Sequence, residues 1–171
     1  VERVAMVRWS GPLMPDFKST GASVRLEPLR RLRVTLRMRR RTRRLAVLLE
    51  EVVAFGVLFS SKAGVVYLNT VKSASYIRAA VRLGLPTILH VHEGVPDLIS
   101  TSLSRYRLEP SHFHALILVA CSESVRKDLA RIVNVPPEEI SVLYSVCDAI
   151  EVCRLASAAV AAPSLPARPL T

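Results

Sequence analysis

GVVYLNTVKSASYIRAAVRLGLPTILHVHE, residues 64–93, combines two apolar runs with a helical stretch between them. GVVYLN (64–69) is almost continuously apolar, which predicts a strand covered on both faces. SASYIRAAVRLG (73–84) predicts a helix that Gly84 ends, because glycine tolerates the left-handed conformation found after a helix C-terminus. LPTILHVH (85–92) predicts a second buried strand, whose last residue is His92. A strand, a helix and another strand predict a parallel pair joined by a right-handed crossover.

The same alternation continues after residue 93. A loop is followed by a strand at HALILVAC (114–121), a helix at ESVRKDLARIV (123–133), a turn at NVPPEE and a last strand at ISVLYS (140–145). Ser122 is placed to cap the helix, and Glu123 lies favourably against its dipole.

The N-terminal part predicts further elements of the same kind. VERVAMVRW (1–9) and ASVRLEP (22–28) read as strands, and GPLMPDFKSTG (11–21) as a loop and short helix closed by Gly21. The longest helix spans about 42–60. Its apolar spacing predicts that one face turns to the core and that Glu50 and Glu51 lie opposite; the core-facing set is Leu45, Leu48, Leu49, Val52 and Val53. The predicted fold is therefore an α/β domain over residues 1–150 with a doubly wound parallel sheet, followed by an irregular tail at 151–171.

Composition limits the classes of function. Half of the 171 residues are hydrophobic, as in a globular domain, and no apolar run is long enough for a membrane span. No signal peptide is visible, and three cysteines without CxxC spacing indicate thiols in a reducing compartment. The net charge of +10 is concentrated at residues 25–44, where ten arginines face one glutamate; they are Arg25, Arg30, Arg31, Arg33, Arg37, Arg39, Arg40, Arg41, Arg43 and Arg44. Such a cluster attracts nucleic acid or anionic lipid, or forms a solvated basic helix surface.

Polar residues follow three predicted strands: Asn69, His92 with Glu93, and Ser122 with Glu123. Ligands of parallel sheets bind beyond the carboxyl ends of the strands, so we expect these residues along one edge of a site. His92 can hydrogen-bond a hydroxyl-rich ligand, and Glu93 can accept from a sugar hydroxyl or orient the imidazole.

All four histidines occur as His-x-His pairs, His90/His92 and His112/His114. Two histidines on one strand face could bind a metal, but the spacing supplies no third and fourth ligand. We therefore assign no metal site, and a metal-dependent hydrolase ranks third among the possible functions. Core or second-layer roles are favoured for His90, and structural roles for the second pair in or beside a short helix. The chain has no glycine-rich phosphate loop.

Three segments, taken in order, resemble the N-terminal domain of family-four glycosyltransferases, which are retaining nucleotide-sugar enzymes of the GT-B fold. They are SGPLMPDFKSTGASVRLEP, the quoted stretch 64–93, and HALILVACSESVRKDLARIVNVPPEEISVLY. The resemblance implies that His92 and Glu93 line the acceptor and transferred-sugar side of an interdomain cleft. It also implies that Asn69, Ser122, Glu123 and Arg126 face the same cleft, and that no cofactor is needed beyond the nucleotide-sugar donor.

The chain also departs from the family pattern. The first strand with its glycine-rich loop is not found, YSVCDAI replaces an Asn-Gly-Val-Asp segment, and no donor-binding domain follows. We therefore expect the acceptor-side half of a glycosyltransferase that is poorly active alone. It would be cytoplasmic, would take a nucleotide sugar and a glycan or lipid-linked acceptor, and could lie peripherally at the inner membrane face. The alternative is a non-catalytic α/β module whose arginine-rich segment binds anionic membrane or, less favourably, nucleic acid.

Overall fold

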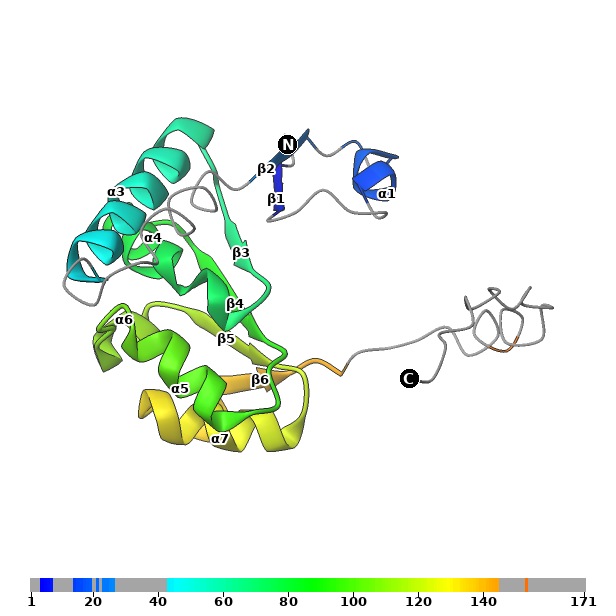
Figure 1. The fold of residues 1–171 in the computed structure, drawn as a ribbon. Coiled ribbons are helices and arrows are strands. Elements are labelled where there is room, and N and C mark those ends of the chain that lie inside the picture. The colour runs from blue at the N-terminus through cyan, green and yellow to red at the C-terminus, as the bar shows by residue number, and fades with distance from the viewer. Residues whose placement is uncertain are drawn as a thin grey trace, which may run out of the picture.

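The structure is a computed structural model that describes residues 4–7, 14–19, 21, 23–26, 43–144 and 153. Its main body is a four-stranded parallel sheet in the order β3-β4-β5-β6 (Figure 1). These strands are β3 (Val66–Leu68), β4 (Thr87–Val91), β5 (Ile117–Ala120) and β6 (Ile140–Val142). A separate parallel pair consists of β1 (Val4–Val7) and β2 (Ser23–Leu26). The predicted parallel α/β fold is confirmed.

Helices make every connection between the four strands of the main sheet. Between β3 and β4 they are η2 (Val71–Tyr76) and α4 (Ile77–Arg82); between β4 and β5, α5 (Pro96–Ser104) and α6 (Pro110–His114). Between β5 and β6 they are α7 (Glu123–Val133) and η3 (Pro137–Glu139). The 19-residue helix α3 (Arg43–Ser61) precedes β3 and packs on η2 and α4, and α1 (Met14–Ser19) lies between β1 and β2 in the chain.

The register divides the main sheet into a buried and a more open face. Leu68, Leu89 and Leu118 are paired across neighbouring strands, and all three are buried. The alternate positions Tyr67 and Ile117 are more than half exposed. One face of the sheet therefore supplies the core beneath the helices, and the other carries Tyr67 with the buried His90 beside it.

Two predicted helix ends are confirmed in detail. Gly84 has a φ of 63°, in the left-handed region that favours glycine, and directly follows Leu83, the C-cap of α4. Ser122 accepts a hydrogen bond from the backbone N–H of Val125 and so caps α7. The helix predicted at 73–84 begins earlier than expected, as the 3-10 helix η2 from Val71.

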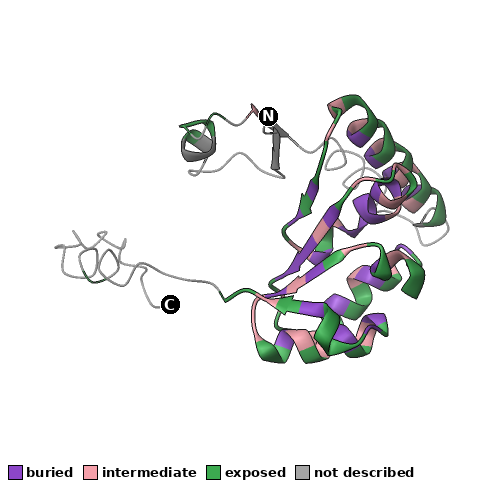
Figure 2. Ribbon diagram, turned by 180° about the vertical axis from the view of Figure 1, so that it is seen from behind, coloured by how far each residue is buried: buried purple, intermediate pink, exposed green. Residues whose placement is uncertain are grey.

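The predicted orientation of the long helix is wrong for most of its core-facing set, although Val53 packs against the core as expected. Glu50 is fully buried, whereas Leu45, Leu48 and Val52 are more than half exposed. Buried and exposed positions alternate along α3 (Figure 2). The Glu50 carboxylate lies 2.5 Å from Tyr106 Oη and 2.7 Å from Arg105 Nη2. Since α3 is apolar around most of its circumference, the hydrophobic pattern did not determine the buried face, and this polar cluster did.

The loop predicted after β4 is also partly wrong, because residues 96–104 form α5. Pro96 stands at the helix start, where its missing N–H costs nothing, and Ile99 and Leu103 are buried four residues apart. The strand predicted from His114 begins only at Ile117, since His114 ends α6. The strand β4 ends at Val91, so His92 is the first residue after it.

Several predicted features lie outside the described residues. They include the side chain of Arg43, which begins α3, the tail apart from Cys153, and Arg37, Arg39, Arg40 and Arg41. Arg44 is described and exposed. Cys121 and Cys153 are free thiols. Among the helices described, none has the length and apolar character required to cross a membrane.

Candidate functional site

The carboxyl ends of β3 and β4 bring Asn69 and His92 together. Their strands are adjacent and parallel, so each residue follows its strand at the same edge of the sheet. His92 Nε2 lies 2.8 Å from Asn69 Oδ1, which is a good hydrogen-bond distance. Because an amide oxygen only accepts, this contact places the proton of neutral His92 on Nε2 and leaves a lone pair on Nδ1. The imidazole is exposed and is held from one side.

Tyr67 and His90 extend this contact into the open face of the sheet. Tyr67 Oη lies 2.5 Å from His90 Nδ1 and 3.3 Å from Asn69 Oδ1. The His90 and His92 rings are only 3.9 Å apart between centroids. Burial lowers the pKa of His90 below its ordinary value of 6.5, and the neighbouring His92 lowers it further. His90 is therefore a neutral support behind His92, and its buried Nε2 has no partner among the described residues.

Glu93 joins the ends of the two strands through its carboxylate. The hydroxyl of Thr70 donates to Oε1, and the backbone N–H groups of Val71 and His92 lie 3.4 and 3.2 Å from Oε2. Both oxygens are thus engaged by the loops that carry Asn69 and His92. This arrangement orients the strand ends rather than leaving the carboxylate free.

The end of β5 presents the first turn of α7. Ser122 Oγ accepts from Val125 N–H at 3.3 Å, and Arg126 Nη2 lies 2.6 Å from Glu123 Oε2. The Arg126 Nε atom is buried and has no hydrogen-bond partner among the described residues. Backbone N–H groups at such a helix start carry partial positive charge and suit an anion.

The predicted residues thus form two groups at one edge of the sheet. Asn69, His92 and Glu93 are connected through hydrogen bonds at the ends of β3 and β4, and Glu123 with Arg126 forms a pair at the end of β5. No hydrogen bond or ion pair joins the two groups within the part of the chain that the structure describes. A ligand that contacts both groups would have to bridge from β4 to β5.

A model of the family described as Glycosyltransferase Family 4 matches residues 3–149, which is most of the chain and includes both groups. The chain belongs to glycosyltransferase family 4. No curated protein and no solved structure shows a significant match.

The hydrogen-bonded group at the ends of β3 and β4 also includes Tyr67 and Thr70, which were not predicted from the sequence. Tyr67 alternates with the buried Val66 and Leu68, and this alternation is a signal that its side chain shares a face with Asn69. Thr70 caps η2, with its hydroxyl 3.2 Å from the backbone N–H of Lys72. Its contact with Glu93 depends on the pairing of β3 with β4, which local sequence does not specify.

The second histidine pair, His112 and His114, lies in α6, away from the hydrogen-bonded group at the ends of β3 and β4. His112 Nδ1 accepts from the backbone N–H of Glu109 and completes a capping box at the start of α6. His114 Nδ1 is 3.7 Å from Glu139 Oε2, and both side chains are half exposed. Within residues 43–144 and the other described positions, no group of three or more metal-ligating side chains comes together.

Proposed function

We propose that the chain is the acceptor-side half of a retaining glycosyltransferase that uses a nucleotide-sugar donor. Membership of glycosyltransferase family 4 supports a glycosyltransferase role. The observation that carries the finer proposal is the exposed His92 imidazole held by Asn69 at the carboxyl ends of two parallel strands.

His92 contacts the transferred sugar in this proposal. With Nε2–H donated to Asn69, Nδ1 is an acceptor for a sugar hydroxyl, and Glu93 holds the loop that carries His92. The acceptor hydroxyl oxygen bonds to the anomeric carbon while the bond from that carbon to the nucleotide diphosphate breaks. The diphosphate leaves with the electron pair of the broken bond, and the hydroxyl proton passes to the diphosphate or to solvent.

The first turn of α7 serves the departing diphosphate. Ser122, Glu123 and Arg126 surround backbone N–H groups that favour negative charge. The Arg126 guanidinium adds positive charge once a phosphate competes with Glu123 for it. Stabilisation of the leaving group also depends on a donor-binding domain, so we expect low turnover from these 171 residues alone.

Ligand-observed NMR tests this proposal without requiring turnover. UDP-glucose and GDP-mannose are the probes, and saturation transfer from the chain to the sugar protons measures weak binding. We expect His92→Ala to weaken binding by about tenfold, the effect of losing one or two hydrogen bonds. Lys72→Ala is the control. Lys72 is exposed, and the structure records no contact between its side chain and Asn69, His92 or Glu93. Binding that is equal in wild type and His92→Ala would refute the assignment of His92.

A second candidate function is attachment to an anionic surface. The arginines of residues 25–44 lead directly into α3, whose outward side is apolar. Duplex nucleic acid offers phosphates but no apolar layer, so the combination favours a membrane. In this proposal the protein is cytoplasmic and peripheral at the inner membrane face, and its acceptor is lipid-linked.

A further inference from the structure

Four side chains at the ends of β3 and β4 form a hydrogen-bonded network in which each member can place its protons in more than one way. They are Tyr67, Asn69, His90 and His92, which we call the strand-end network. A phenol hydroxyl both donates and accepts, a neutral imidazole carries its proton on either nitrogen, and an amide can turn its oxygen or its nitrogen to a partner. The chemistry that the network offers to a ligand depends on which arrangement it adopts.

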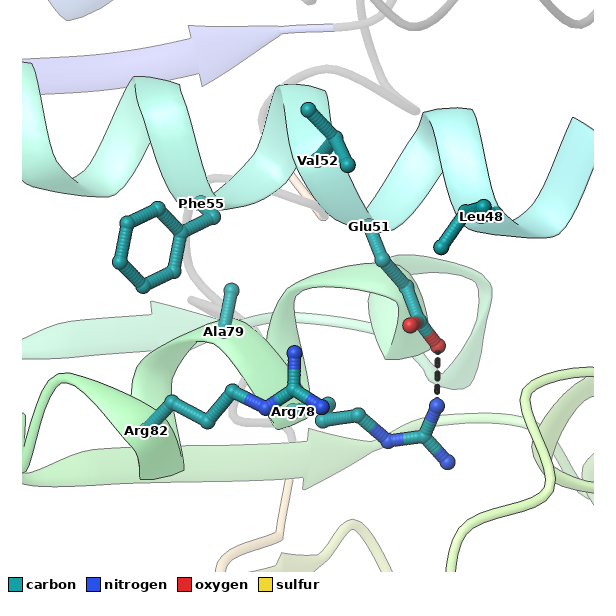
Figure 3. Close-up of a pocket in the computed structure, with 7 residues that line it drawn as sticks. All are labelled: Leu48, Glu51, Val52, Phe55, Arg78, Ala79 and Arg82. Carbon is teal, nitrogen blue, oxygen red and sulfur yellow. Dashed lines mark hydrogen bonds and ion pairs between the residues drawn. The ribbon is translucent and has the colours of Figure 1, made fainter.

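The polar pair beside the pocket between α3 and α4 has no such freedom. There Arg78 Nη1 lies 2.7 Å from Glu51 Oε1 (Figure 3). A guanidinium only donates and a carboxylate only accepts, so this contact has one possible arrangement of protons. In the strand-end network the arrangement has to follow from burial and from the partners of each atom.

The direction of the strand-end network is set at His90. This residue is 4% exposed, and its Nε2 is buried without a hydrogen-bond partner among the described residues. Burial and the neighbouring His92 lower the pKa of His90, so the ring is neutral and carries one proton. Buried N–H groups without a partner are rarer in proteins than buried acceptors without one. The proton of His90 therefore belongs on Nδ1, which has a partner.

That partner is the hydroxyl of Tyr67. Tyr67 Oη lies 2.5 Å from His90 Nδ1, so it accepts the His90 proton and cannot donate its own there. Its hydroxyl proton is left for Asn69 Oδ1, at 3.3 Å. Because a donor needs an acceptor, the amide of Asn69 turns its oxygen to Tyr67 and its nitrogen away.

The same amide oxygen determines the tautomer of His92. It lies 2.8 Å from His92 Nε2, and an oxygen that only accepts requires a proton on that nitrogen. Nδ1 of His92 is then an acceptor. If the amide were reversed, the Asn69 nitrogen would donate to Nε2, and Nδ1 would carry the proton and act as a donor.

The reversed network is disfavoured at its buried end. Tyr67 would then donate to His90 Nδ1, and the His90 proton would have to lie on Nε2. That atom would become a buried donor without a partner among the described residues, which carries the desolvation cost of an unpaired N–H.

We propose that Tyr67 is a positioning residue that holds the Asn69 amide and thereby fixes the tautomer that His92 presents to its ligand. The consequence is selectivity, because His92 Nδ1 accepts from a hydroxyl group and repels an oxygen that has only lone pairs, such as that of an ionised phosphate. The nature of the ligand, a sugar with free hydroxyls, rests on the proposed function. The tautomer is a property of the protein alone.

Ring ¹⁵N NMR of the 171-residue chain at about pH 8.5, where an ordinary imidazole is neutral, tests the proposal without a ligand. Long-range ¹H–¹⁵N spectra report the tautomer of each histidine, and His90→Gln and His92→Gln assign the two sets of signals. We expect opposite tautomers in wild type, Nδ1–H at His90 and Nε2–H at His92. An Nε2–H form at His90 would reverse the network and overturn the proposal.

Tyr67→Phe removes the hydroxyl and keeps the half-exposed ring, so the fold should be retained. We expect the ratio of Nε2–H to Nδ1–H at His92 to fall about threefold to tenfold, the effect of one lost hydrogen bond. Tyr144→Phe is the matched control, because Tyr144 is exposed to a similar extent, 59% against 54%, and lies outside the network. A His92 ratio that stays the same in Tyr67→Phe, or changes equally in Tyr144→Phe, would refute the role of Tyr67.

Saturation-transfer NMR with UDP-glucose separates this proposal from the proposed function. Tyr67→Phe should weaken binding in the wild-type background and have little further effect in His92→Ala, because Tyr67 acts through His92. An equal loss in both backgrounds would overturn the positioning role. If His92→Ala left sugar binding unchanged while the tautomers were as expected, the proposed function would fail and the role of Tyr67 would stand.

Discussion

His92 is oriented by its neighbours rather than by its own backbone position. Asn69 accepts from Nε2, and the His90 ring lies against the His92 ring, tilted by 40° at a centroid distance of 3.9 Å. Two hydrogen bonds connect Tyr67 to His90 and to Asn69. A substitution at any of these three residues should therefore alter the orientation of the His92 ring.

Removing the Asn69 amide should release the His92 ring. We expect Asn69→Ala to weaken sugar binding by about threefold to tenfold, and Asn69→Asp, which keeps an acceptor oxygen at the same place, to retain most of it. The ¹⁵N shifts of His92 should report a mixture of tautomers in Asn69→Ala and mainly the Nε2–H form in wild type. A pure Nδ1–H form in wild type would contradict the hydrogen-bond assignment.

The lowered pKa of His90 makes stability depend on pH. The unfolded chain binds a proton at the ordinary value of 6.5, whereas the folded chain binds it only at lower pH. The stabilisation is therefore complete above pH 6.5 and declines as pH falls from there through the folded-state pKa. Urea denaturation at about pH 7.5 and about pH 5.5 should show a smaller loss of stability in His90→Gln than in wild type. Equal losses in both proteins would contradict a buried neutral His90.

At the scale of elements, α3 is anchored through a buried carboxylate. Glu50 contacts Tyr106 and Arg105 at the end of α5, while Arg78 connects Glu51 to the carbonyl oxygens of Tyr106 and Arg107. These contacts decide which side of an almost wholly apolar helix is turned inward.

Deleting this anchor should destabilise the protein strongly. Glu50→Ala removes the carboxylate that Tyr106 and the partly exposed Arg105 share, and we expect a loss of about 2–3 kcal/mol in the free energy of unfolding. Tyr106→Phe removes one hydrogen bond and should cost about 1–2 kcal/mol. Asp128→Ala is the control, because its partner Arg131 is exposed and the pair should contribute at most about 1 kcal/mol. Equal urea midpoints for Glu50→Ala and the control would show that the buried carboxylate is not an anchor.

Two variants of Ser122, which caps α7, can separate a structural role of this residue from a role in ligand binding. Ser122→Ala loses the cap and should cost about 1 kcal/mol, whereas Ser122→Asp keeps a capping oxygen and should preserve stability. If the first turn of α7 receives the diphosphate, Ser122→Asp should nevertheless weaken nucleotide-sugar binding, because its charge repels phosphate. Thermal melting and saturation-transfer NMR on the same samples measure the two effects, and unchanged binding in Ser122→Asp would remove α7 from the site.

At the scale of the whole molecule, the helices and one face of the main sheet enclose one core within residues 43–144. Leu89 is fully buried on β4, while Ile117, on neighbouring β5 and the opposite face, is 57% exposed. Stability should therefore depend on the two faces very differently.

Truncating one leucine and one isoleucine measures this asymmetry. We expect Leu89→Ala to lower the free energy of unfolding by about 2–5 kcal/mol and Ile117→Ala by less than about 1 kcal/mol. Urea denaturation provides both values. Similar losses would mean that the open face of the sheet is packed against another part of the protein.

The sequence by itself determined the elements whose signals are local. The cap at Ser122, the glycine after α4 and the apolar strands each act through neighbouring residues, and they placed Asn69, His92 and Ser122 after three parallel strands. Tertiary structure alone decided which face of α3 is buried, that Pro96–Ser104 is a helix packed on the core, and that Tyr67 reaches His90. These features depend on contacts between residues distant in sequence, and apolar periodicity cannot select among the faces of a helix that is apolar all round.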